Sequence, residues 1–192
     1  RPACYAAIMT GRQTRANPAL QRRGHAIAEA TRSGENTRDE PRGRGQRVRE
    51  DEVLAILART KPPVLDTLGG GVVAYDKGLD RVTMQWQAET RHCHSVEGHP
   101  RGGIVQGGIV TGWIDSAMAH ACVAKSVFTV GVPSLEIKVS FLSAAHPGIY
   151  RSYGWVVKWG RSIAFLEGEL RDEEGALIAR ASSTAAMRHL KK

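Results

Sequence analysis

Cysteine is scarce in this chain of 192 residues, with only Cys4, Cys93 and Cys122 at widely separated positions. An odd and scattered set of cysteines does not supply the disulfide framework of a small secreted domain. The chain also lacks any apolar run that approaches the length of a membrane span, and its first residues lack the charged-then-apolar plan of a secretory signal. We therefore predict a protein of the reducing cytoplasm, with no membrane segment.

Lysine is absent from the first 50 residues, and the charge of the chain is unevenly distributed. The net charge is +8, and these 50 residues alone hold eleven Arg against five acidic residues. They have few aromatic residues and no sustained apolar periodicity, so they bury too little apolar surface to offset the entropy of ordering. We predict that residues 1–49 are a disordered basic extension. A nucleic-acid-binding arm is the alternative, but no recognisable reading motif supports it, and we predict no nucleic-acid partner.

The remaining residues, 50–192, show the periodicity expected of one folded domain. Residues 50–60 place acidic residues ahead of an apolar stripe and predict a short amphipathic helix, which Pro62-Pro63 ends. Residues 72–76 and 81–88 flank a turn and predict a hairpin. Residues 89–105 predict a loop that is rich in His, Gly and Pro. Further strands are predicted at 134–143, 148–159, 162–172 and 176–188, with turn residues between them.

A long apolar helix is predicted from about Gly108 to Lys125, directly after Gly107. One such helix followed by a run of strands predicts an α+β fold, with the helix packed on one face of an antiparallel sheet. A helix N-terminus presents unpaired N–H groups and a partial positive charge, and glycine lets a carbonyl group approach the backbone closely. The Gly107 N–H and a neighbouring amide are therefore candidates to polarise a carbonyl.

One carboxylate, Asp115, lies within this apolar helix, eight residues after Gly107. An acid among Ile, Val, Trp, Ala and Met residues is costly unless it is paired or used. At neutral pH it is ionised and serves as a general base or as a nucleophile, and the sequence does not choose between the two. Oxyanion donors and a carboxylate on one rigid element are the parts of an acyl-transfer site.

Several spaced motifs resemble those of the hot-dog-fold acyl-CoA thioesterases, in particular the phenylacetate-pathway and 4-hydroxybenzoyl-CoA type enzymes. The resemblance covers about residues 64–188. Its motifs are Gly-x-Val-Gln-Gly-Gly at 103–108, Asp115 followed by Ser-Ala-Met-Ala, the alternating strand from Ser134 to Phe-Leu-Ser-Ala-Ala, Gly160-Arg161-Ser162, and the acidic turn at 172–175 with the strand after it. In one departure, Gln106 stands where the commonest motif has His, and the usual Asn falls on Pro100, beside His99.

The resemblance implies a hot-dog fold, with the antiparallel sheet wrapped around one central helix, and hydrolysis of an acyl-CoA to free acid and CoA. Gly107 then polarises the carbonyl and Asp115 is the base or nucleophile. Ser134 holds the attacking water or the carboxylate, unless it is an ordinary strand-start hydroxyl. Gln106 orients the thioester or braces the glycine loop. The substrate-binding residues are Gly108, His99, Arg161 and Ser162, of which Arg161 meets the phosphates or pantetheine arm of CoA unless it is a solvated turn residue.

A single unit of this kind leaves an edge strand open, which proteins seldom tolerate. The resemblance implies that two units pair edge to edge and share each site, with the glycine loop from one chain and Asp115 from the other. Such dimers stack into tetramers, and we predict a homo-oligomer that is at least a dimer. No cofactor is predicted, because the CoA belongs to the substrate.

Three alternatives remain at this point. The first is a non-catalytic acyl-CoA sensor of the same fold, but such regulators carry an N-terminal helix-turn-helix that residues 1–50 do not show. The second is a dehydratase or hydratase, which needs an Asp and a His close together at the helix start, whereas Asp115 and His120 lie within the helix. The third is a zinc site; its candidate ligands lack a second pair at ligand spacing, so we predict no metal and place them around the pocket mouth. These candidates are His92, Cys93, His94, His99 and His120.

Overall fold

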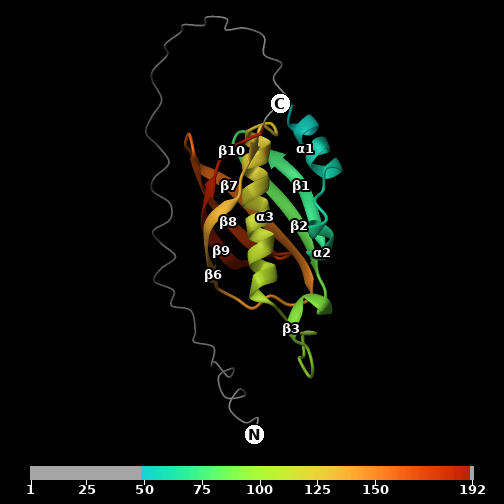
Figure 1. Ribbon diagram of the computed structural model, residues 1–192. Helices are drawn as coiled ribbons and strands as arrows, with labels where there is room; N and C mark the ends of the chain where they lie inside the picture. Colours follow the sequence, from blue (N-terminus) through green and yellow to red (C-terminus); the bar gives the residue numbers. More distant parts are fainter. Residues whose placement is uncertain (1–48, 191–192) are drawn as a thin grey trace, which may run out of the picture. The chain divides into compact units, whose positions relative to one another are not determined.

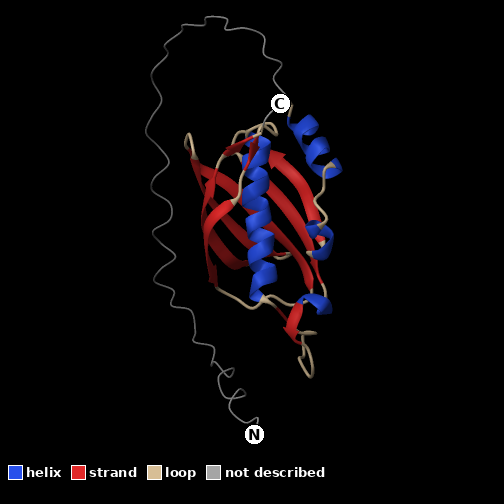
Figure 2. Ribbon diagram, in the orientation of Figure 1, coloured by secondary structure: helices blue, strands red, loops and turns tan. Residues whose placement is uncertain are grey.

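The computed structural model describes residues 49–190. The predicted extension 1–49 lies outside these residues except for its last one, so what we predict of it stays a prediction. Within residues 49–190, Figure 2 shows one long helix against a large sheet, with only short helices elsewhere. This is the α+β arrangement predicted from the sequence.

The first helix, α1 (Glu50–Arg59), begins and ends close to where the sequence predicts. Its acidic first turn suits the positive end of the helix dipole, and the Arg49 backbone N–H donates to the Glu52 carboxylate at 3.2 Å. Val53 and Leu57, one turn apart, are both buried. The helix packs through this face against the first strand of the sheet.

A second helix, α2 (Val64–Thr67), follows Pro62-Pro63. The sequence predicts only a stop there, because four residues are too few to show a helical period. Leu65 is the buried residue of α2. The helix therefore packs its one buried side chain next to the first strand of the sheet.

Six strands form one antiparallel sheet in the order β1-β2-β7-β8-β9-β6. Their bounds agree with the predicted hairpin and the four later strands to within two residues. Alternate residues face inward, so that β2 buries Val82, Met84, Trp86 and Ala88. The strands are β1 (Gly70–Asp76), β2 (Arg81–Ala88), β6 (Ser134–Phe141), β7 (Gly148–Trp159), β8 (Ile163–Asp172) and β9 (Leu177–Ala186).

The long helix α3 (Gly107–Lys125) lies along the inner face of the sheet (Figure 1). Its buried side includes six residues with no exposed surface: Trp113, Ile114, Ala117, Met118, Ala121 and Cys122. The helix approaches the backbone of β7 closely, because a Cβ built on Gly154 would lie 2.3 Å from the backbone of Ala117. This close packing fixes α3, and with it any group on the helix, against a rigid sheet.

Short strand pairs close the two ends of α3. Residues 89–105, which the sequence predicts as a loop, contain a 3-10 turn (Thr90–His92) and the pair β3 (Cys93–Ser95) and β4 (Ile104–Val105). At the other end of α3, β5 (Val130–Gly131) pairs with β10 (Arg188–His189). Strands of two or three residues show no alternation, so the sequence does not predict them. No helix within residues 49–190 has the length and apolar character needed to cross a membrane.

Candidate active site

The start of α3 has one backbone amide without an acceptor. Gln106 is the N-cap residue, and its side-chain Oε1 accepts hydrogen bonds from the amides of Gly108 and of Ile109, the latter at 3.2 Å. Its carbonyl oxygen also accepts from the Ile109 N–H at 2.9 Å. The Gly107 N–H has no hydrogen-bond acceptor among residues 49–190. It is therefore the amide of the first turn that a ligand oxygen can use, at the positive end of a long helix.

The amides of Gly107 and Gly108 thus differ in whether they are free to bind a ligand. Gly107 keeps its N–H group available, as we predict for the carbonyl-polarising amide. Gly108, which we predict to bind substrate, has its amide occupied by Gln106. Gln106 itself braces the glycine loop, one of the two roles predicted for it.

Backbone hydrogen bonds hold the segment before Gly107 in place. The Gln106 N–H donates to the carbonyl of His92 at 2.9 Å, and the Val105 N–H donates to the carbonyl of Ala145 at 2.9 Å. His92 is buried; its Nδ1 accepts from the Glu89 N–H at 3.0 Å and its Nε2 bonds to the Thr67 carbonyl at 3.1 Å. His92 therefore supports the fold beneath the loop. The sequence analysis had instead placed it at the pocket mouth.

Asp115 lies two turns further along α3 and is half-buried. The Ser134 hydroxyl, at the start of β6, donates to the Asp115 carboxylate at 2.8 Å. The structure thus brings together these two residues, which are 19 positions apart in the sequence. The ion pairs of residues 49–190 do not include Asp115, so its charge is not neutralised by a neighbouring cation.

Gly107 and Asp115 do not share a site within one chain. They are eight residues apart on a straight helix, which corresponds to about 12 Å along its axis. A single thioester carbonyl that accepts a hydrogen bond from the Gly107 amide does not reach the Asp115 carboxylate over this distance. One chain therefore keeps the Gly107 amide and the Asp115–Ser134 pair apart, and we refer to these two predicted groups as half-sites.

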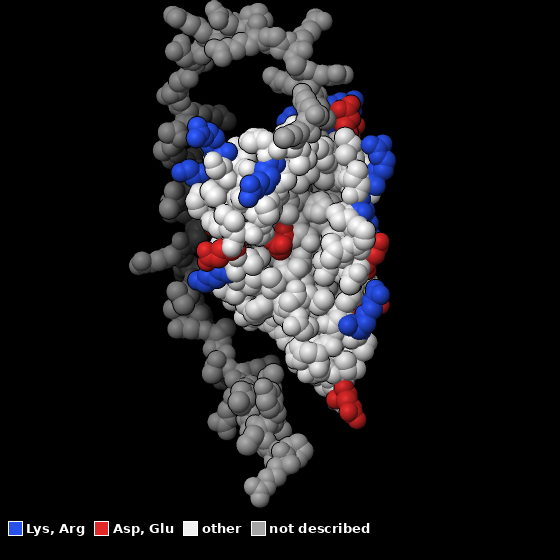
Figure 3. Space-filling model, in the orientation of Figure 1, with Lys and Arg blue, Asp and Glu red and all other residues white. Residues whose placement is uncertain are grey.

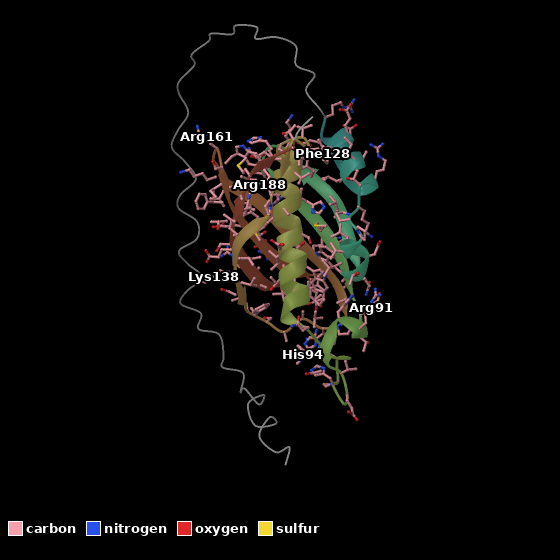
Figure 4. All side chains as sticks on the ribbon, in the orientation of Figure 1. Arg91, His94, Phe128, Lys138, Arg161 and Arg188 are labelled. Carbon is pink, nitrogen blue, oxygen red and sulfur yellow. The ribbon has the colours of Figure 1, made fainter. Side chains whose placement is uncertain are left out.

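The predicted CoA-binding residues lie at both ends of α3. The ring of His99 stacks on that of His146 with centroids 5.1 Å apart, and His146 Nδ1 bonds to the Gly103 carbonyl at 2.7 Å, near the start of α3. Arg161 and Ser162 lie at the other end, where the Met187 N–H donates to the Ser162 carbonyl at 2.8 Å. Figure 4 shows Arg161 at the same end as Phe128 and Arg188, and His94 at the opposite end. One chain therefore does not place Arg161 beside Gly107.

Three of the predicted metal-ligand candidates have other surroundings. Among residues 49–190, no group of three His, Cys, Asp or Glu side chains converges at ligand distances. His120 Nδ1 bonds to the Ser116 carbonyl at 2.7 Å, one turn back on its own helix, and burial lowers the pKa of this histidine. His92 and Cys93 bond to backbone groups of the 3-10 turn region. A neutral His120 that is bound to its own helix gives no support to a dehydratase pair with Asp115.

The sequence analysis missed Phe141, the last residue of β6, whose ring contacts Gly107. The alternation of Ile137, Val139 and Phe141 indicates that the ring faces inward, but no pattern in the sequence says that the end of this strand meets the start of α3. Figure 3 shows that charged side chains are sparse on the face of the domain that carries α3.

Gln106→Ala is expected to lower the free energy of unfolding by about 1 kcal/mol, because the Gly108 amide loses its acceptor and the Ile109 amide keeps only the Gln106 carbonyl. Gln106→Asn is the matched control, since Asn is a favourable N-cap residue and keeps the amide oxygen. Urea unfolding at equal protein concentrations measures both variants. Equal stability of Gln106→Ala and the unaltered protein would show that this cap contributes nothing.

Comparisons with known proteins agree with this geometry. Residues 102–179 match the family model of the thioesterase superfamily. Over these residues the chain is similar to the thioesterase superfamily, and the domain has the hot-dog fold, as the motifs predict. No curated protein sequence matches the chain significantly.

Solved structures show the same fold. A phenylacetic acid degradation-related protein of Ralstonia eutropha is 26% identical, with a TM-score of 0.59, and the match covers 70% of this chain and 98% of that one. A thioesterase family protein of Silicibacter pomeroyi is 25% identical, with a TM-score of 0.59 over 72% of this chain and 96% of its own. A Streptococcus mutans protein solved with bound acetyl-CoA is 14% identical, with a TM-score of 0.55 over 65% and 92%.

Proposed function

We propose that this domain hydrolyses an acyl-CoA thioester to the free acid and CoA. The observation that carries the proposal is the pair of half-sites, an uncommitted amide at Gly107 and an unpaired carboxylate at Asp115 held by Ser134. The Gly107 N–H stabilises the carbonyl oxygen as it gains negative charge. Asp115 either takes a proton from the attacking water or attacks the carbonyl itself, and Ser134 orients it.

A second copy of the chain supplies the missing half of each site. Within residues 49–190, β6 is an edge strand that pairs only with β9. The Leu142 N–H donates to the carbonyl of Ile178 in β9. The alternate residues Ile137, Val139 and Phe141 therefore direct their backbone groups to the open edge. An antiparallel copy of β6 is therefore able to form hydrogen bonds there and to remove the open edge.

Charge complementarity selects one register for this pairing. Glu136 and Lys138 pair with Thr184 and Ser182 of β9 and share the outer face. A two-fold axis at Ile137 places Glu136 of each chain opposite Lys138 of the other, whereas an axis at Lys138 places the two lysines opposite each other. Because a bulge lies between Ser134 and Glu136, the Ile137 axis also brings Ser134 of one chain opposite Val139 of the other, two residues from Phe141 and its contact with Gly107.

In this dimer the long axes of the two domains run in opposite directions. The Asp115–Ser134 pair of one chain then approaches the Gly107 amide of the other, and each site is complete. The turn between β7 and β8, which contains Arg161 and Ser162, likewise approaches the glycine loop of the second chain, where Arg161 contacts CoA phosphates. A solved structure of the same fold contains acetyl-CoA, which supports this ligand class.

Charge reversal at the edge strand is expected to weaken the dimer. Glu136→Lys and Lys138→Glu each replace two attractive cross-strand pairs with repulsive ones, which raises the dimer dissociation constant roughly tenfold. The double variant restores both pairs and is expected to return near the original constant. Analytical ultracentrifugation over a range of protein concentrations measures all three. A double variant as weak as the single variants would contradict the register.

The proposed activity is tested by the release of free thiol from a panel of short, medium, long and aryl acyl-CoAs by the full chain. We expect turnover of at least one acyl-CoA, with no added metal or cofactor and no effect of a chelator. Binding of acyl-CoA without turnover would favour the non-catalytic sensor. Loss of activity with chelator and its return with zinc would instead assign a role to the histidines. A cytoplasmic location fits this substrate and remains part of the proposal.

A further inference from the structure

The end of β6 brings an aromatic side chain to the start of α3. Phe141 pairs with Ala179, a fully buried residue of β9, so its side chain points to the inner face of the sheet. A Cβ built on Gly107 would lie 3.2 Å from Cζ of Phe141, and 3.5 and 3.8 Å from its Cε1 and Cε2. The edge of the ring therefore fills the space beside Gly107 that a side chain would need.

Phe141 is not a core residue, although it points inward. It is 55% exposed, because β6 lies at the edge of the sheet and leaves one side of the ring uncovered by residues 49–190. A ring that is only half-buried contributes correspondingly less hydrophobic stabilisation than a core aromatic residue. Its position against an uncommitted amide therefore calls for an explanation other than the stability of the domain.

The opposite side of the glycine pair is bounded by Gln106. A Cβ built on Gly108 would lie 2.7 Å from Oε1 of Gln106. A carbonyl oxygen that accepts from the Gly107 amide, at about 3 Å from the nitrogen, thus enters a space between Gln106 and Phe141. The acyl carbon next to that carbonyl comes close to the ring edge.

We propose that Phe141 is a specificity-determining residue that selects against acyl groups branched at the carbon next to the carbonyl. This inference rests on the proposed thioesterase function. An unbranched acyl chain presents a CH₂ group to the ring and gains van der Waals contact. An additional methyl group at that carbon needs volume that the ring edge occupies. One methyl group in an apolar site changes kcat/KM by roughly tenfold or more.

The test compares two substrates with the full chain and three variants. The substrates are the most active straight-chain acyl-CoA of the panel and the same acyl-CoA with a methyl group at this carbon. Phe141→Ala is expected to raise the kcat/KM ratio of branched to straight substrate roughly tenfold, and Phe141→Leu is expected to raise it less. Leu142→Ala is the matched control, since Leu142 is the adjacent apolar residue and is also 55% exposed. Its ratio is expected to stay within about twofold of the original.

Thermal melting curves show whether each variant is folded, and Phe141→Leu supplies the comparison if Phe141→Ala does not fold. An unchanged ratio in the Phe141 variants overturns the assignment, and so does an equal change in Leu142→Ala, which would attribute the effect to the edge strand as a whole. Both results leave the thioesterase activity itself standing. The absence of turnover by the unaltered chain with every acyl-CoA overturns the proposed function instead.

Discussion

Asp115→Asn is expected to lower the turnover number for acyl-CoA hydrolysis by at least roughly a hundredfold. Asn is nearly isosteric with Asp and keeps an oxygen that accepts the hydrogen bond from the Ser134 hydroxyl. At neutral pH, however, it neither takes a proton nor attacks a carbonyl. Steady-state thiol release by the full chain measures the effect.

The same substitution is expected to leave the melting temperature unchanged or higher. Asp115 is a half-buried carboxylate that takes part in none of the ion pairs of residues 49–190. Neutralising an unpaired charge that is held for chemistry does not cost stability. A purely structural Asp115 would instead lose about 1–3 kcal/mol of stability and leave turnover nearly normal. Asp66→Asn, which neutralises an exposed carboxylate paired with Lys61, is the control for removing a charge.

The long helix and the long strands were predictable from the sequence, because their apolar pattern repeats several times. The long helix was placed within one residue of α3, because the residues between the glycine pair and Lys125 are mostly apolar or small, with Asp115 and His120 as the main exceptions. The strands β6 to β9 were predicted because each alternates over at least eight residues between turn residues. The difference at the start of α3 has a local cause: Gln106 caps the helix with its side chain, a role in which Ser, Thr, Asp and Asn are more usual.

Contacts between distant elements were not predictable in the same way. The Phe141–Gly107 contact joins the end of a strand to the start of a helix 34 positions earlier, and neither local pattern refers to the other. The histidine-rich segment suggested a pocket mouth, but His92 satisfies backbone groups beneath the loop. The family resemblance implied that Arg161 contacts CoA, which stays a prediction, but it did not show that Arg161 lies at the far end of α3 from Gly107. In the proposed dimer, such residues come together from two chains.

Gly107→Pro is expected to remove the oxyanion donor while leaving the fold intact. Gly107 is the first residue of α3, and proline is favourable at this position because its missing N–H has no partner in the helix. The preceding residue Gln106 has φ −67° and ψ 135°, a conformation that a following proline accepts. The melting temperature is therefore expected to be unchanged or higher, since proline also reduces the entropy of the unfolded chain.

Turnover by Gly107→Pro is expected to fall by at least roughly a hundredfold, the usual cost of losing one oxyanion donor. Gly107→Ala is the matched control, because it adds a Cβ that meets the Phe141 ring edge at 3.2 Å but keeps the amide N–H. The ring is more than half exposed and is able to move aside, so Gly107→Ala is expected to lose less than about tenfold. If both variants lose activity equally, the contact with Phe141 and not the amide limits the reaction. If Gly107→Pro retains turnover, the carbonyl is polarised elsewhere, because no other amide of the first turn of α3 takes over once Gly108 and Ile109 are bound to Gln106.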